Sequence, residues 1–256
     1  MNQVAEIEHG ATQCGSLFSW LAAELVERTS AGGYARIQLG LRDELPSFSA
    51  GQFLLLRFKD QTLLPRAFSP VRAEGTHAEL LIKEEGLVRE QLASCPPGTQ
   101  IEVRGPYGTP LIEVIERDRT YVLAGGGSGV APLLCFRAQH PDLVSGTVFG
   151  FRPAGVQALF PDDRIVAEER GDPLADSVTL SLRTEADGLI ACGPEPMLAS
   201  LARALPGDSD LYVSLETRLG CGIGACLGCS IETTAGMRRV CVDGPAFRAV
   251  ELPWLT

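Results

Sequence analysis

The stretch "TYVLAGGGSGVAPLLCFRAQ", residues 120–139, decides the fold class of this chain. Its apolar run, glycine-rich turn and helical segment follow the order strand, turn, helix that begins a doubly wound α/β unit. Glycines let the backbone approach a ligand, and a helix N-terminus attracts anions, so the turn predicts a site for dinucleotide phosphates. The alternative is that the glycines serve only the packing of the turn. The predicted turn residues are Gly125, Gly126, Gly127, Ser128 and Gly129.

Towards the C-terminus the same pattern continues. The segments "GTVFGF" (146–151) and "SVTLSL" (177–182) read as strands, and "GLIACGPEPMLASLARAL" (188–205) repeats strand, turn and helix. Cys192, Gly193 and Pro194 stand at the carboxyl end of a predicted parallel strand, where such sheets bind ligands. We therefore expect an α/β domain over residues 111–208 that binds a nicotinamide dinucleotide.

Towards the N-terminus the sequence predicts a small antiparallel β-barrel over residues 22–110. Four apolar or alternating segments are separated by turn residues: "YARIQLGL" (34–41), "GQFLLLRF" (51–58), "HAELLIK" (77–83) and "TQIEVRG" (99–105). Between them, "RAFSP" offers the charged fork of Arg66 and the hydroxyl of Ser69 to a phosphate. The alternative for this stretch is a surface strand with a salt bridge.

Residues 1–21 form a separate N-terminal extension. The apolar residues Leu17, Trp20, Leu21 and Leu25 have helical spacing, so we expect a helix that docks on its own chain or on a partner. The acidic start, and an apolar stretch too short for a signal peptide or membrane span, predict a cytoplasmic protein with no membrane segment.

The composition narrows the class of partner. With 22 basic and 32 acidic residues the net charge is -10, so no basic stripe is available and nucleic-acid binding is not expected.

Disulfides are rare in the cytoplasm, so a tight group among the eight cysteines indicates a metal site. Cys14, Cys95 and Cys135 are scattered and are expected to be small apolar residues.

That tight group is the stretch "CGIGACLGCS" (221–230) together with Cys241, in a lobe expected over residues 209–256. Its pattern is Cys221-x4-Cys226-x2-Cys229-x11-Cys241, and the first three cysteines have the plant-type spacing that binds a [2Fe–2S] cluster. The interspersed glycines let the backbone fold closely around the bridging sulfides. The alternative is a structural zinc site, although such sites usually present two C-x2-C pairs and this chain has one.

Together these motifs resemble the electron-transfer subunit of class 1B dihydroorotate dehydrogenase, a branch of the ferredoxin–NADP reductase superfamily. The shared features are the R-x-x-S barrel motif, G-G-G-x-G-x-A-P, C-G-P-x-x-M, "SLETRLGCGIGACLGC" and "RRVCVDGPAF", and they cover about residues 21–247. The resemblance implies an α+β multidomain fold with an FAD barrel, an NAD domain and a C-terminal [2Fe–2S] lobe.

The resemblance also implies which residues contact FAD. By position these are Arg66, Ala67, Phe68 and Ser69, then Leu81, Ile82 and Lys83, and a third stretch that includes Val88 and Arg89. The family typically has G-x-G-T in that third stretch, whereas this chain has Gly86, Leu87, Val88 and Arg89. Arg89 is therefore expected either to replace a hydroxyl contact with a charge or to face solvent.

The cofactor set predicts the mechanism. A nicotinamide exchanges two electrons as hydride and a [2Fe–2S] cluster exchanges one, so a flavin is needed between them, and no catalytic acid, base or nucleophile is expected. No segment is left for an organic substrate, so the resemblance implies a flavin-containing catalytic subunit, in a heterotetramer that oxidises dihydroorotate to orotate for pyrimidine biosynthesis. Ile223, Ala225, Leu227 and Phe247 are expected to contact that subunit or to pack over the cluster.

Three alternatives stay open at this stage. The chain could be a diaphorase-like subunit of another complex, such as a sulfhydrogenase or a ferredoxin-dependent reductase. It could instead be a zinc-stabilised interaction module. NADP is not excluded, because Arg152 follows a predicted strand and could meet a 2′-phosphate.

Overall fold

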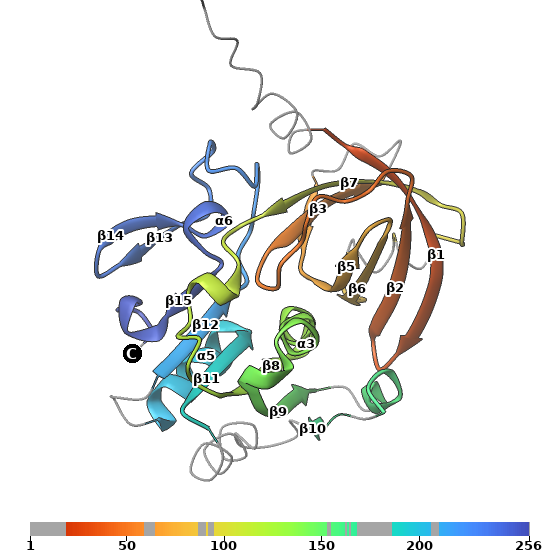
Figure 1. The fold of residues 1–256 in the computed structure, drawn as a ribbon. Helices are drawn as coiled ribbons and strands as arrows, with labels where there is room; N and C mark the ends of the chain where they lie inside the picture. Colours follow the sequence, from red (N-terminus) through yellow and green to blue (C-terminus); the bar gives the residue numbers. More distant parts are fainter. Residues whose placement is uncertain are drawn as a thin grey trace, which may run out of the picture.

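The computed structural model describes residues 19–58, 65–86, 91, 95–152, 155–161, 163, 165–167, 186–205 and 210–255. Figure 1 shows a strand-rich barrel, an α/β unit beside it and a small C-terminal lobe. This arrangement confirms the expected α+β multidomain fold. No helix among the described residues is long and apolar enough to cross a bilayer. The predicted strand 177–182, Cys14, Val88 and Arg89 lie outside the described residues.

The barrel is a seven-stranded antiparallel sheet with the order β4-β3-β7-β1-β2-β6-β5. Its two edge strands, β4 and β5, are consecutive in the chain with only Ser69 between them, so the sheet curls back on itself. Ser69 therefore lies where the barrel closes. The strands are β1 (Leu21–Ala31), β2 (Tyr34–Leu41), β3 (Phe53–Phe58), β4 (Arg66–Phe68), β5 (Pro70–Glu74), β6 (His77–Lys83) and β7 (Gln100–Tyr107).

Strand β1 corrects one expectation. The segment read as a helix is a strand from Leu21 onward, paired with β2 and β7. Burial alternates along it, as expected for a strand: Ala23 and Leu25 are buried, whereas Glu24 and Val26 are exposed. A spacing of four residues fits both a helical face and every second residue of a strand, so Leu21 and Leu25 alone could not separate the two.

The α/β unit is a six-stranded sheet with the order β10-β9-β8-β11-β12-β15. All pairs are parallel except β12 with β15, and the chain order reverses between β8 and β11, which makes this the topological switch point. Its strands are β8 (Tyr121–Gly126), β9 (Val144–Phe151), β10 (Ile165–Ala167), β11 (Gly188–Gly193), β12 (Asp210–Leu215) and β15 (Ala246–Arg248). Its helices are α3 (Val130–Gln139) and α5 (Glu195–Ala204), with 3-10 turns η1 (Leu111–Glu113), η2 (Gly127–Gly129), η3 (Pro141–Leu143) and η4 (Val156–Leu159).

The C-terminal lobe is tied to both larger parts. It contains a hairpin of β13 (Ser230–Thr233) and β14 (Gly236–Arg239), helix α6 (Val240–Asp243) and the 3-10 turn η5 (Ala249–Glu251). Its strand β15 extends the α/β sheet by pairing with β12. Thr109, just after the barrel, donates its backbone N–H to the Gly244 carbonyl at 2.7 Å. The lobe is thus held against the end of β7 and the edge of the α/β sheet.

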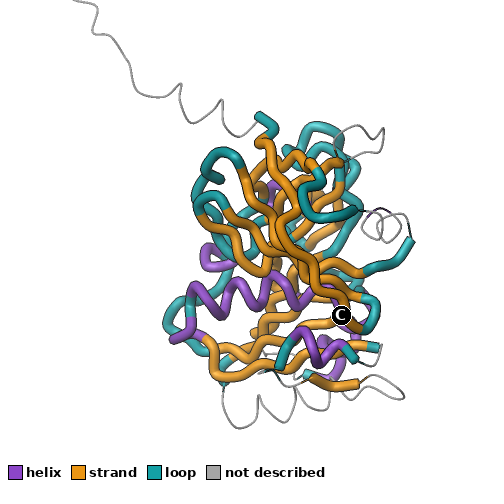
Figure 2. Tube along the Cα trace, turned by 90° about the vertical axis from the view of Figure 1, so that its right-hand side faces the viewer, coloured by secondary structure: helices purple, strands orange, loops and turns teal. Residues whose placement is uncertain are grey.

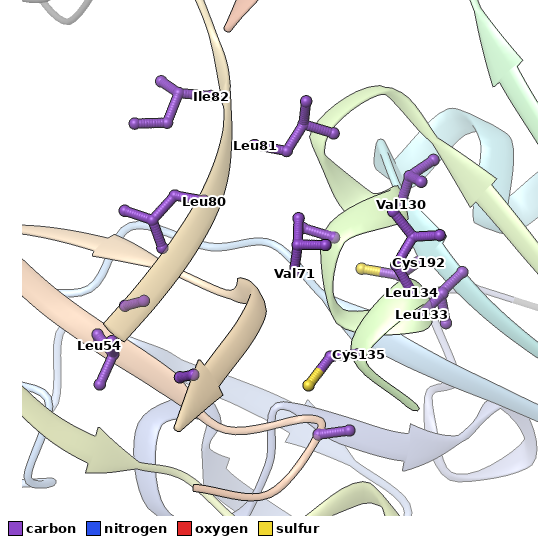
Figure 3. Close-up of a cluster of buried hydrophobic side chains, with 14 of the residues drawn as sticks. Leu54, Val71, Leu80, Leu81, Ile82, Val130, Leu133, Leu134, Cys135 and Cys192 are labelled. Carbon is purple, nitrogen blue, oxygen red and sulfur yellow. The ribbon is translucent and has the colours of Figure 1, made fainter. Parts of the chain in front are cut away.

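Two apolar cores join these parts. One unites the barrel interior with helix α3, and Figure 3 shows Leu80 and Val71 of the barrel on one side and Leu133 and Leu134 of α3 on the other. Figure 2 shows helical segments between the two sets of strands. The second core runs from Leu55 of β3 through the α/β sheet to the C-terminal lobe. Because apolar burial is continuous across the boundaries, the three parts pack as one body.

Candidate functional site

A cleft of about 600 Å³ lies between the barrel and the carboxyl ends of β11 and β12. One wall comes from β4 and β6, and the other from the η2 turn, β11 and the segment after β12. The structure therefore brings six of the predicted flavin residues and two of the predicted nicotinamide residues, Ser128 and Cys192, to one site. The cleft is lined by Phe53, Ala67, Phe68, Ser69, Leu81, Ile82, Lys83, Glu85, Gly86, Ser128, Pro132, Cys192, Ser214, Leu215, Glu216, Thr217, Arg218, Leu219 and Pro245.

The barrel wall contains six of the seven expected flavin residues that are described. Ala67, Phe68 and Ser69 lie at the closure of the barrel, and Leu81, Ile82 and Lys83 end strand β6, which pairs with β5. The seventh, Arg66, is exposed beside this wall and does not line the cleft. Among the described residues it has no ion-pair partner, so its guanidinium is available to an anion.

The glycine-rich turn divides into lining and packing residues. Ser128 lines the cleft, whereas the neighbouring glycines do not. A Cβ on Gly129 would lie 2.4 Å from the Cys192 carbonyl oxygen, so this glycine lets the turn pass directly over β11. Gly127 has a φ of 58° and faces the Tyr34 hydroxyl, 2.9 Å from where its Cβ would be. The packing alternative therefore describes these glycines at least as well as phosphate binding does.

The C-G-P stretch divides in the same way. Cys192 lines the cleft, and burial, followed by the nearby Glu216 carboxylate, raises the pKa of its thiol, which stays protonated. Gly193 and Pro194 do not line the cleft but pack against Gly126. Gly125 also packs against its neighbours rather than lining the cleft, because a Cβ at this position would lie 2.7 Å from Val130 Cγ2. Only Ser128 and Cys192 of the predicted nicotinamide residues reach the cleft.

Glu216 is a cleft residue that the sequence reasoning missed. It follows β12, the strand next to β11 at the switch point, and accepts a hydrogen bond from Ser128 Oγ at 3.3 Å. Glu216 keeps an exposed surface, but partial desolvation by the cleft raises the pKa of its carboxyl, while the Ser128 hydrogen bond and the Lys83 charge act in the opposite direction. A signal was available in "SLETRLG", because the segment after a parallel strand beside a switch point is where ligands bind.

Glu216→Gln is expected to change how stability depends on pH. The folded-state pKa of Glu216 lies above its ordinary 4.5, so its stabilising contribution is present below that value and is lost as the pH rises through the folded pKa. Glutamine removes this loss, so the melting temperature of the variant relative to that of the wild type should rise as the pH increases from about 4 to about 7. Thermal melts over this range check it, with Glu232→Gln, on strand β13 of the C-terminal hairpin and outside the cleft, as the control. A constant difference between variant and wild type would contradict the assignment.

The four cysteines of the lobe form two pairs of neighbouring thiols. Cys221 interacts with Cys226, and Cys229 interacts with Cys241. Backbone N–H groups are directed at sulfur: Cys226 donates to Cys221 Sγ at 3.4 Å, and Gly224 donates to Cys241 Sγ at 3.2 Å. The chain thus offers four thiols and N–H donors on one short loop.

The environment of these thiols differs within the group. Burial alone would raise the pKa of Cys221, but backbone N–H groups of Ile223, Cys226 and Ala225 bring it down to about 7. Burial, and then the neighbouring Cys229, raise the pKa of Cys241 to about 12. Ionising all four thiols so close together requires a compensating cation, which bound iron supplies.

The donor set fits a binuclear cluster. Among the described residues, no group of three or more His, Cys, Asp and Glu side chains is placed to hold a single metal ion. A [2Fe–2S] cluster instead takes four thiolates spread over two irons, which suits two pairs of thiols. Leu227, between Cys226 and Gly228, has a φ of 58°. It is the only described residue other than glycine with a positive φ, so the loop holds it in a strained conformation.

The exposed face of the lobe is apolar next to the ligands. Ile223, Leu227 and Val242 are 40%, 61% and 38% exposed, and Ala225 is exposed as well. Phe247 is only 4% exposed, so of its two predicted roles, contact with a partner and packing within the lobe, its burial excludes the first. Its strand β15 pairs with β12, opposite Val213, and its ring packs into the core beneath the lobe.

Two protein-family models match this chain, one over the barrel and one over the C-terminal lobe. The family model of an oxidoreductase FAD-binding domain matches residues 25–111. The family model of the iron-sulfur cluster binding domain of dihydroorotate dehydrogenase B matches residues 216–253, which include all four cysteines of the lobe.

Solved structures share the fold. A structure of an NADH-dependent reduced ferredoxin-NADP oxidoreductase superposes with a TM-score of 0.74 at 22% identity, covering 90% of this chain and 89% of its own. Phthalate dioxygenase reductase superposes with a TM-score of 0.60 at 15% identity, covering 78% and 70%. At these identities the likeness concerns the fold alone.

Two curated relatives are closer in sequence, and both are named dihydroorotate dehydrogenase B (NAD(+)), electron transfer subunit. The protein from Geobacillus sp. (strain WCH70) is 34% identical over 79% of this chain and 86% of its own length. The one from Bacillus pumilus (strain SAFR-032) is 33% identical over 82% and 89%. The chain therefore belongs to the family of electron transfer subunits of NAD-dependent dihydroorotate dehydrogenase B.

Proposed function

We propose that this chain carries electrons between NAD+ and the flavin of a separate catalytic subunit that oxidises dihydroorotate to orotate. The observation that carries the proposal is the cleft, in which the predicted flavin wall and Ser128 and Cys192 of the nicotinamide side face one another. The cluster lobe adjoins the same region, because Pro245 lines the cleft within four residues of Cys241. The residues that we propose to bind the three redox groups thus lie around one region of the molecule, which supports the proposal.

The residues that would hold each group follow from their positions. Bound FAD exchanges hydride with a nicotinamide and single electrons with an iron–sulfur cluster, which is the chemistry that this set of groups supplies. The barrel wall from Ala67 to Ser69 and from Leu81 to Lys83 would bind the flavin, with Arg66 outside the cleft for its phosphates. Ser128 and Cys192 would orient the nicotinamide. The protonated Cys192 thiol is small, uncharged and weakly polar, so it would let the nicotinamide ring approach the flavin ring.

The partner proposal rests on the apolar face of the lobe. Ile223, Leu227 and Val242 are exposed beside the cluster ligands, and a surface of this kind excludes water when it is covered by a second protein. The catalytic subunit would bind here, in a heterotetramer of two copies of each chain. We place this complex in the cytoplasm, where the thiols of the lobe remain reduced until they bind iron.

The cofactor content and diaphorase activity of the whole chain test the proposal. Protein purified without oxygen should contain FAD, iron and acid-labile sulfide, and should oxidise NADH with ferricyanide in the absence of the partner. NADH should be preferred to NADPH in kcat/KM. Protein that binds no flavin and reduces no ferricyanide would overturn the proposal.

Arg66→Ala is expected to weaken FAD binding. A charge-assisted hydrogen bond to phosphate contributes about 1.5–3 kcal/mol, so the dissociation constant should rise roughly tenfold to a hundredfold. Fluorescence titration of flavin-free protein with FAD measures this change. The matched control is Arg72→Ala, since Arg72 is also exposed on the adjacent strand but pairs with Glu74 at 2.9 Å. Equal affinities for Arg66→Ala and the wild type would exclude Arg66 from the site.

A further inference from the structure

Arg104 is a cation that has no compensating charge within the described part of the chain. It lies on β7 and is half-buried, and no carboxylate among the described residues pairs with it. Its Nε is fully buried and has no hydrogen-bond partner in the described part of the chain. A buried guanidinium donor without a partner is costly, which points to an anionic group that completes its surroundings.

Aromatic rings fix the position of this guanidinium. Arg104 Cζ lies 4.6 Å from the centre of the Trp20 ring and 5.8 Å from that of the Tyr107 ring. Trp20 also stacks on Arg57, at 4.2 Å, from the neighbouring strand β3. Arg57 differs in one respect, because it pairs with the Glu102 carboxylate at 2.5 Å. Of these two stacked arginines, Arg57 has a carboxylate partner and Arg104 has none among the described residues.

Arg104 faces the loop that bears the first cluster ligand. Its Nη2 donates a long hydrogen bond, 3.5 Å, to the Cys221 carbonyl oxygen. The next residue, Gly222, sits against the same part of the barrel: a Cβ there would lie 3.0 Å from Leu55 Cδ1 and 3.3 Å from the Tyr107 ring. The barrel thus presents a fixed cation directly beside Cys221.

We propose that Arg104 raises the reduction potential of the [2Fe–2S] cluster and holds the Cys221 end of its loop in place. This inference rests on the proposed function, since it requires that the four cysteines bind the cluster. Two ferric ions, two sulfides and four thiolates carry two negative charges, and reduction adds one electron and no proton. The guanidinium stays protonated throughout, so it stabilises the reduced cluster more than the oxidised one. Arg104 is therefore a positioning and tuning residue for electron transfer.

Redox titration of the full chain tests this role without any turnover. Protein purified anaerobically is poised with dithionite and mediators, and the reduced cluster is counted by its electron paramagnetic resonance signal. At one applied potential, Arg104→Met should lower the ratio of reduced to oxidised cluster about tenfold, equivalent to about 59 mV for one electron. Methionine keeps an unbranched stem between the two rings and removes the charge. Arg104→Lys, which keeps the charge, should stay within about threefold of the wild type.

Arg57→Met is the matched control, because it removes a cation from the same Trp20 stack without touching the Cys221 loop. It should leave the ratio unchanged. A ratio in Arg104→Met equal to that of the wild type, or an equal drop in Arg57→Met, would overturn the inference. If circular dichroism shows that Arg104→Met is unfolded, Arg104→Gln is titrated in its place. Wild-type protein without iron and sulfide would overturn the proposed function itself, which separates the two failures.

Discussion

Cys241→Ser is expected to remove the iron–sulfur cluster while the flavin stays bound. Cys241 is 2% exposed and interacts with Cys229, so its replacement by the harder, rarely ionised serine hydroxyl would leave one iron with a single thiolate in a buried site. Iron and acid-labile sulfide per chain should fall at least about tenfold. FAD content and NADH oxidation by ferricyanide should stay within about twofold of the wild type, because the cleft lies outside the ligand loop. Metal analysis, sulfide assay and visible absorption measure these quantities.

Cys95→Ser is the control for that experiment. Cys95 is partly exposed and belongs to the barrel region, so serine there should leave iron, sulfide and flavin unchanged. The zinc alternative predicts a different wild type, with about one zinc per chain and no acid-labile sulfide. Finding such protein after anaerobic purification would contradict the cluster assignment.

The double variant Ile223→Glu/Leu227→Glu is expected to abolish electron transfer to the partner. Two carboxylates on the apolar face beside the ligands would be desolvated by a bound subunit, and the affinity should fall about a hundredfold. Dihydroorotate oxidation coupled to NAD+ should fall in parallel when the two subunits are mixed at concentrations near the wild-type dissociation constant. NADH oxidation by ferricyanide, which needs no partner, should be unchanged. Co-purification with the catalytic subunit and the coupled assay measure the two effects.

Met237→Glu is the matched control for the docking face. Met237 is 67% exposed on strand β14 of the same lobe, outside the 221–230 stretch that carries the first three cysteines and the apolar face beside them. Its substitution should leave the complex and the coupled rate unchanged. Wild-type chain that oxidised dihydroorotate with NAD+ in the absence of any partner would contradict the proposed division between subunits.

Local patterns were sufficient for most of the elements. The strand, turn and helix of residues 120–139 are β8, η2 and α3, and the predicted segment 34–41 is β2. Alternation and glycine punctuation determine these elements because they act between residues a few positions apart. Strand β1 was misread because a four-residue spacing satisfies a helix and a strand equally, and only its pairing with β2 and β7 separates them.

The site was predicted less completely than the fold. The sequence identified the barrel residues 67–69 and 81–83 through a resemblance, and the structure places all of them on one wall of the cleft. It did not identify Glu216, which reaches the cleft because β12 ends beside the switch point. The sequence also could not distinguish glycines that pack against β11 from residues that line the cleft. Gly129 and Ser128 are adjacent in sequence, but Gly129 packs on Cys192 whereas Ser128 lines the cleft.

The fold class and the chemistry of the cysteine loop could be predicted from local sequence, because thiol spacing and glycine content are properties of a short stretch of chain. Which side chains are buried, and which charges lack a partner among the described residues, depends instead on how distant segments pack. Phe247 is buried because β15 joins a sheet whose other strands are far away in sequence. Arg104 stands beside Cys221 because a strand of the barrel passes under a loop that begins more than a hundred residues later. Such juxtapositions depend on long-range packing, and no local pattern of residues encodes them.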